Sequence, residues 1–92
     1  MTAAQPNQDL APAHVPHMIT ITVNERPVSV AGPRVSGLEI KQAAIHAGVQ
    51  IQLDFVLSEE LANGRTRIVG DADTVTVNKN SRFDAVAGDD NS

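Results

Sequence analysis

Apolar and polar residues alternate in several short runs along the chain. At residues 18–24, Ile19, Ile21 and Val23 alternate with polar positions. After a turn at residues 24–27, Val28 and Val30 alternate around a serine. A period of two is typical of half-buried strands, so these two runs predict a hairpin. Runs of the same kind predict further strands at residues 51–58, 65–69 and 74–78, with Phe55 as the largest core anchor of the third strand.

One segment has the period of a helix instead. Ser36 stands three residues before Glu39, the spacing of a capping box, and Gly48 stands where a left-handed C-terminal residue belongs. These signals predict a helix over residues 37–47. At 100° per residue the small stripe Ile40, Ala43, Ala44 and Ala47 faces the sheet, which leaves Leu38 and Ile45 on the opposite side as candidate partner-binding residues.

The element order predicts an α+β fold, a mixed sheet of four to five strands with one helix packed across it. Residues 1–17 contain three prolines and no apolar periodicity, so we expect a disordered N-terminal tail. We therefore expect a domain at residues 18–80 and a flexible C-terminal tail at residues 81–92. The outward positions of the expected first and last strands are threonines, at 20, 22, 74 and 76, which predicts a sheet face with few apolar side chains.

Composition narrows the range of functions. The formal net charge is -4 and the seven Lys and Arg residues are scattered, so nucleic acid is not an expected partner. The chain has no cysteine, and the expected domain holds a single histidine, so neither catalysis nor a cofactor is expected. His14 and His17 have a metal-ligand spacing, but Pro16 between them disfavours the helix that a metal site there needs, and no metal is expected. Without a signal peptide or an apolar span, we expect a cytoplasmic protein with no membrane partner.

Several phrases are similar to the bacterial multiubiquitin family of ubiquitin-like proteins. They are "ITITVNERPVSV", "VSGLEIKQAA", "DADTVTV" and "SRF". The resemblance covers roughly residues 18–88 and implies the β-grasp fold of ubiquitin. Two features differ from the family pattern: the chain does not end in Gly-Gly, and it holds one copy where many members are tandem repeats.

The resemblance also implies a function, that of a protein modifier. An E1-like adenylating enzyme activates a C-terminal glycine, an E2-like enzyme receives it, and target proteins are joined to it. In some members a processing peptidase first exposes the glycine. In this chain the resemblance implies that Gly88 is the glycine that becomes activated, after cleavage between Gly88 and Asp89. The ten residues that follow Asn78, up to Gly88, provide an arm of roughly 30 Å at about 3.3 Å each.

Other interpretations remain open at this stage. Phe83, with Arg82 beside it, lies beyond the last expected strand, so it either folds back onto the domain or contacts a partner. The same fold also serves as a non-covalent binding adaptor or as a sulfur carrier, and the fold alone does not separate these functions.

Overall fold

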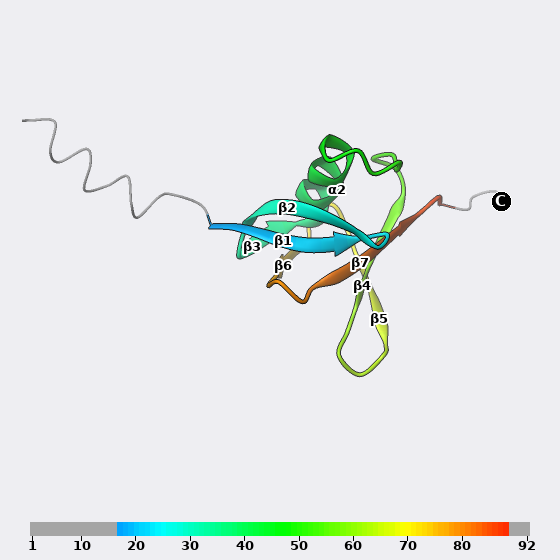
Figure 1. Ribbon diagram of the computed structural model, residues 1–92. Coiled ribbons are helices and arrows are strands. Elements are labelled where there is room, and N and C mark those ends of the chain that lie inside the picture. Colours follow the sequence, from blue (N-terminus) through cyan, green and yellow to red (C-terminus); the bar gives the residue numbers. More distant parts are fainter. Residues whose placement is uncertain (1–16, 89–92) are drawn as a thin grey trace, which may run out of the picture.

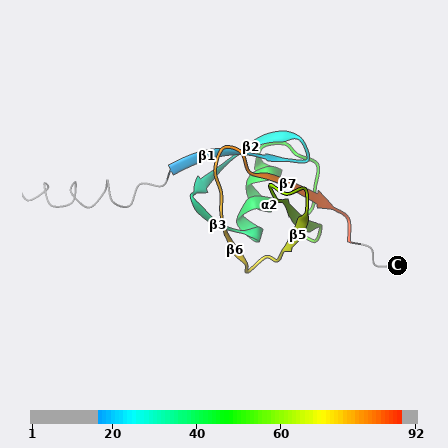
Figure 2. The same ribbon diagram turned by 90° about the horizontal axis from the view of Figure 1, so that it is seen from below.

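The computed structural model describes residues 17–88, which form a five-stranded mixed sheet with one helix across one face (Figure 1). The strand order is β2-β1-β7-β4-β5, and a separate two-stranded ladder joins β3 to β6. The described ends of the chain lie on opposite sides of the domain (Figure 2). The elements are β1 (His17–Val23), β2 (Arg26–Gly32), β3 (Arg34–Ser36), α2 (Gly37–His46), β4 (Val56–Glu60), β5 (Thr66–Val69), β6 (Thr74–Thr76) and β7 (Arg82–Val86).

The first hairpin is confirmed, and its turn is tight. Val23 pairs with Arg26, so the loop consists of Asn24 and Glu25 alone, and both have positive φ angles, 51° and 66°. Two consecutive positive φ angles match the right-handed twist of the strands on either side. Asparagine adopts this conformation more readily than most residues, which suits it to the first turn position.

The helix begins and ends close to where its capping signals predict. Ser36 Oγ accepts a hydrogen bond from the Glu39 backbone, and the Glu39 carboxylate accepts one from the Ser36 backbone, so the capping box is complete. At the other end Gly48 has a φ of +96°, the left-handed conformation that favours glycine. The helix stops at His46, one residue before the predicted end.

Apolar side chains between the helix and the sheet form the core. Most of them are aliphatic, and Phe83 is the largest fully buried one. Lys41 is the one buried charged residue found in the described part of the chain. Its Nζ donates to the carbonyl oxygens of Leu53 and Phe55, at 2.6 and 2.9 Å, and lies 2.7 Å from Asp71 Oδ1. All three ammonium protons thus have an oxygen partner, which is the condition for burying such a charge.

The third strand is shorter than predicted, because residues 51–55 do not join the sheet. β4 begins at Val56, Phe55 is only partly buried, and Leu53 is exposed. The carbonyl groups of Leu53 and Phe55 turn toward Lys41. They are therefore not available to a neighbouring strand, and the prediction that Phe55 is the main anchor of that strand is wrong.

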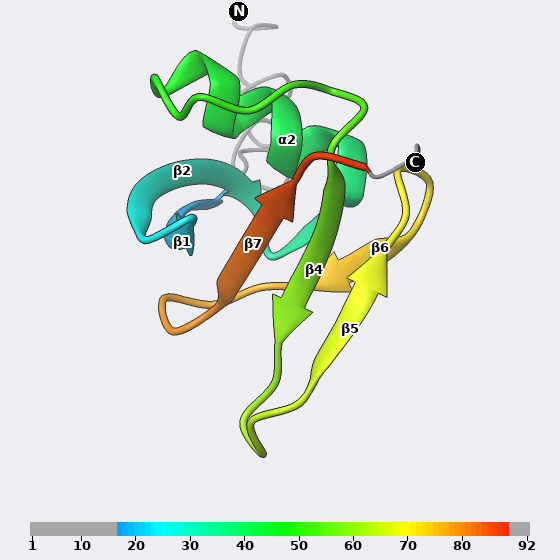
Figure 3. The same cartoon turned by 90° about the vertical axis from the view of Figure 1, so that its right-hand side faces the viewer.

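The expected flexible tail is wrong over residues 82–86, since these residues form the central strand β7 (Figure 3). Phe83 and Ala85 point into the core, while Arg82, Asp84 and Val86 alternate with them on the outer face. The predicted last strand pairs with β3 outside the main sheet. With β7 parallel to β1 and antiparallel to β4, and one helix across the sheet, the fold is a β-grasp of the ubiquitin-like type.

Candidate functional site at the end of the central strand

The carboxyl end of β7 is held from the side by the first hairpin turn. Asn24 Nδ2 donates to the Ala85 carbonyl oxygen at 3.0 Å, and Asn24 Oδ1 accepts from the Ala85 amide at 2.8 Å. The Asn24 backbone amide also donates to the Phe83 carbonyl oxygen. The Asn24 side chain therefore continues the hydrogen bonding between β1 and β7 beyond Val23, the last paired residue of β1. It also fixes the direction in which the chain leaves the sheet.

Gly88 follows β7 after a single intervening residue and is exposed. Two residues at about 3.3 Å each reach roughly 7 Å beyond Val86. The expected arm of roughly 30 Å is therefore wrong, because residues 82–86 belong to the sheet and only Ala87 and Gly88 follow it. An ideal Cβ on Gly88 would lie 3.7 Å from the Asp54 carbonyl oxygen, so this residue still lies beside the segment that leads into β4.

Gly88 differs from Gly37, Gly48 and Gly64 in having no structural reason to be glycine. Gly48 and Gly64 have positive φ angles, and a Cβ on Gly37 would collide with the Gly70 backbone. At Gly88 the φ angle lies outside the positive region, and an added Cβ would make only ordinary van der Waals contacts. The fold thus accepts a side chain at this position.

Apolar side chains are exposed on the outer face of the sheet next to Gly88. Val56 and Val86 lie directly opposite each other on β4 and β7, and Val86 is 59% exposed. On the neighbouring strand β5, Ile68 pairs with Ser58 of β4 and is 67% exposed. The expectation of a sheet face with few apolar side chains is therefore wrong, because it took β6 for the last strand of the sheet. We call Val56, Ile68 and Val86 the outer-face patch.

The four predicted partner-binding residues do not form one surface. Phe83 is 1% exposed and belongs to the core, so it is not available to a partner of the folded domain. Arg82 lies on the outer face with its Nε 3.2 Å from Glu60 Oε1. Leu38 is partly buried and Ile45 is exposed, and both lie on α2, on the other side of the sheet. Asp89 lies outside the described residues.

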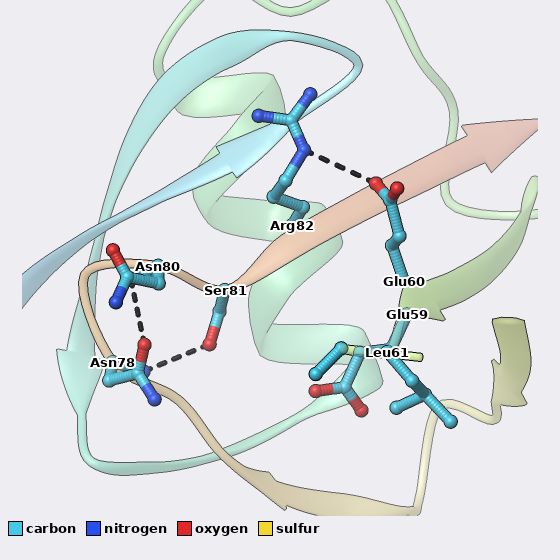
Figure 4. A pocket seen from close by; sticks show the side chains of 8 residues that line it. Glu59, Glu60, Leu61, Asn78, Asn80, Ser81 and Arg82 are labelled. Carbon is cyan, nitrogen blue, oxygen red and sulfur yellow. Dashed lines mark hydrogen bonds and ion pairs between the residues drawn. The ribbon is translucent and has the colours of Figure 1, made fainter. Parts of the chain in front are cut away.

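A groove of about 370 Å³ lies between the end of β4 and the turn before β7 (Figure 4). Its polar walls are bonded to one another: Arg82 to Glu60, and the Asn78 amide to Ser81 Oγ. Glu59, the other carboxylate in it, accepts from Arg67. These bonds join β4 to its neighbours β7 and β5 and close the turn before β7, so the polar groups already have partners within the protein. No group of three or more potential metal ligands occurs within residues 17–88, and no helix there has the length and apolar character to cross a membrane.

Comparison with known protein families gave a match over most of the chain. The family model described as Multiubiquitin matches residues 19–89, a range that begins within β1 and continues past β7. No curated protein and no solved structure matched the chain.

Proposed function

Because this chain belongs to the multiubiquitin family, we propose that it is a ubiquitin-like protein modifier that is activated at the carboxylate of Gly88. A processing peptidase first hydrolyses the Gly88–Asp89 bond and releases residues 89–92. The partners are an E1-like adenylating enzyme, an E2-like enzyme and target proteins.

The observation that carries the proposal is the glycine at position 88. It is exposed at the end of the central strand, and the fold does not require glycine there. Enzymes that activate a chain terminus bind it in a narrow passage, where a residue without a side chain avoids collisions. The structure gives no reason for glycine at position 88, whereas activation of a chain terminus there does.

The chemistry needs only the carboxylate of this chain. A Gly88 carboxylate oxygen attacks the α-phosphorus of ATP, which forms an acyl adenylate and releases pyrophosphate. A cysteine thiolate of the E1-like enzyme then displaces AMP to give a thioester, and a thiolate of the E2-like enzyme takes over the acyl group. A target amine finally attacks the thioester carbonyl, loses a proton and releases the thiol.

The outer-face patch is a suitable docking surface for these enzymes. It holds exposed aliphatic side chains on adjacent strands, beside the point where the chain leaves the sheet. An enzyme that covers Val56 and Val86 has Gly88 within its reach, because all three lie at the same end of the sheet. A short arm is sufficient for an enzyme that docks this close.

The test is mass spectrometry of the chain after co-expression with E1-like, E2-like and peptidase proteins from the same organism. We expect a form that ends at Gly88 and adducts linked through it. Gly88→Trp should abolish the adducts, and Gly88→Ala, which the fold accepts, should reduce them without changing the unfolding midpoint. An intact Ser92 terminus and no adduct would contradict the proposal.

The short arm also favours a second candidate, a non-covalent binding adaptor. With about 7 Å of chain beyond β7, Gly88 stays beside Asp54 and Val56 unless the end of β7 detaches. Binding by an adaptor should survive both removal of residues 89–92 and Gly88→Trp, whereas conjugation should not. Pull-down under denaturing conditions separates the two, because only a covalent adduct withstands denaturation.

A further inference from the structure

The strand β2 is a free edge of the sheet, and beyond Arg26 and Pro27 at its start it carries no charged residue. It is the last strand on its side, opposite β5 (Figure 3), and pairs only with β1 among the described residues. From Val28 to Ala31 its residues are Val, Ser, Val and Ala. Natural proteins usually place charged residues, bulges or very short strands at such edges to prevent pairing with other chains.

The direction of the backbone groups of β2 follows from a hydrogen bond on the other side of β1. The Thr22 amide donates to the Ser81 carbonyl oxygen, toward β7 and away from β2. Thr22 and its partner Pro27 are therefore not a hydrogen-bonded pair, and in an antiparallel ladder the same holds at every second pair. Ser29 and Ala31 accordingly direct their N–H and C=O groups outward, away from β1.

A groove runs beside this edge, between β2 and the helix. Its volume is about 210 Å³, and it is lined by Ser29, Val30, Ala31, Val35, Glu39, Gln42 and Ala43. Ligand pockets for small molecules usually have at least about 300 Å³. An aliphatic floor next to outward-pointing backbone groups instead suits an extended peptide, which adds a strand to the edge and places every second side chain in the groove.

The opposite edge is less suitable for the same role. β5 has four residues against seven in β2, and Arg67 lies within it, bonded to Glu59, whereas the one charged residue of β2, Arg26, lies at its end next to the turn. A short edge with a charged residue is the usual protection against strand addition. The groove beside β2 is therefore the better site for an added strand.

We propose that the groove between β2 and α2 binds an extended segment of a partner protein by strand addition, with small aliphatic residues at alternate positions and a lysine or arginine next to Glu39. The charge preference follows from Glu39, the one charged side chain among the described residues that line the groove. The glutamate is exposed, and only its Oε1 is used in the capping box. This site lies on the other side of the sheet from the outer-face patch and does not depend on activation of Gly88.

The probe is a synthetic heptapeptide in which three valines alternate with two threonines between terminal lysines, titrated into the full chain and followed by NMR. We expect shifts and slowed hydrogen exchange at the amides of Ser29 and Ala31. A matched peptide with terminal glutamates should bind several-fold more weakly at low salt. Equal binding of the two peptides, or shifts confined to β5, would overturn the proposal.

Two pairs of protein variants make the test specific. Ser29→Pro removes the outward N–H, and the fold should tolerate it because Pro27 occupies the same phase of the strand. It should weaken binding at least about tenfold, the equivalent of one lost hydrogen bond of about 1.4 kcal/mol, whereas Ser29→Ala should change it less than twofold. Glu39→Gln preserves the capping box and should weaken binding of the lysine peptide roughly two- to fivefold.

The alternative occupant is a second copy of this chain. Sedimentation velocity over a range of concentrations, without peptide, distinguishes it. A monomer at all concentrations supports a partner peptide. A dimer in which the Ser29 and Ala31 amides are protected would overturn the proposal, as would unchanged peptide binding by Ser29→Pro.

Discussion

Lys41 holds the helix, the segment before β4 and the turn before β6 together through three oxygens. The Lys41 side chain is 5% exposed, so its loss leaves two partly buried carbonyl groups without this donor. We predict that Lys41→Met, which keeps the apolar stem, lowers the free energy of unfolding by about 2–4 kcal/mol in urea denaturation.

The matched control for Lys41 is Asp71→Asn. The Asp71 side chain is 54% exposed, so water compensates for most of the lost charge. We expect a loss of at most about 1 kcal/mol, smaller at high salt. If the two variants lose equal stability, the carbonyl contacts of Lys41 are not what stabilises this region.

Gly37 and Gly88 allow a position where the fold requires glycine to be compared with one where it does not. A Cβ on Gly37 would strike the Gly70 carbonyl oxygen, which cannot move without disturbing the hydrogen bond that it accepts from the Asp73 amide. We predict that Gly37→Ala costs about 1–3 kcal/mol of unfolding free energy, while Gly88→Ala changes it by less than about 0.5 kcal/mol. A large loss in Gly88→Ala, measured by the same urea titration, would assign that glycine a structural role.

At the level of elements, the contact between the first turn and β7 sets the end of the sheet. Asn24→Ala removes both bonds to Ala85 and places alanine at a positive φ, so we expect a loss of about 1–3 kcal/mol. Asn24→Gly removes the same bonds but accepts the φ angle. We expect hydrogen exchange at the Ala85 amide to accelerate in both variants, and the smaller loss of stability in Asn24→Gly.

The elements that the sequence predicted correctly are those whose signals are local. The first hairpin and the helix depend on alternation, turn residues and caps within a few positions, and all of these lie inside the element. β7 pairs with β1, about sixty residues earlier in the chain, in a parallel ladder that leaves no turn signal. Its run "RFDAV" also includes two charged residues, which lie on the outer face. From sequence alone, this short run resembles the polar residues around it, which predicts a tail.

The geometry around the proposed terminus Gly88 was not predictable from the local sequence. Gly88 follows from the family resemblance, but its reach depends on where β7 ends, which the local pattern did not reveal. The groove beside β2 was not predicted at all. A strand edge becomes a binding surface only through the order of strands in the sheet and the position of the helix, and both are properties of the whole molecule.

The stability of the whole molecule should depend on β7, because this strand alone joins the two halves of the sheet. Without it, β2–β1 and β4–β5 remain as separate hairpins, and isolated hairpins are at best marginally stable. Phe83 and Ala85 also leave the core. We predict that a chain ending at Asn80 is unfolded by circular dichroism and shows no cooperative urea transition.

A chain ending at Gly88 is the matched control, since it keeps every described strand. Its urea midpoint should equal that of the full chain, and its NMR spectrum should retain the signals of the core. Cooperative unfolding of the chain that ends at Asn80 would support the domain boundary that the sequence predicts at residue 80. It would also support a long arm before Gly88. Loss of structure only in the shorter chain confines the arm to Ala87 and Gly88, so the activating enzyme that we propose would have to dock against the outer-face patch to reach the terminus.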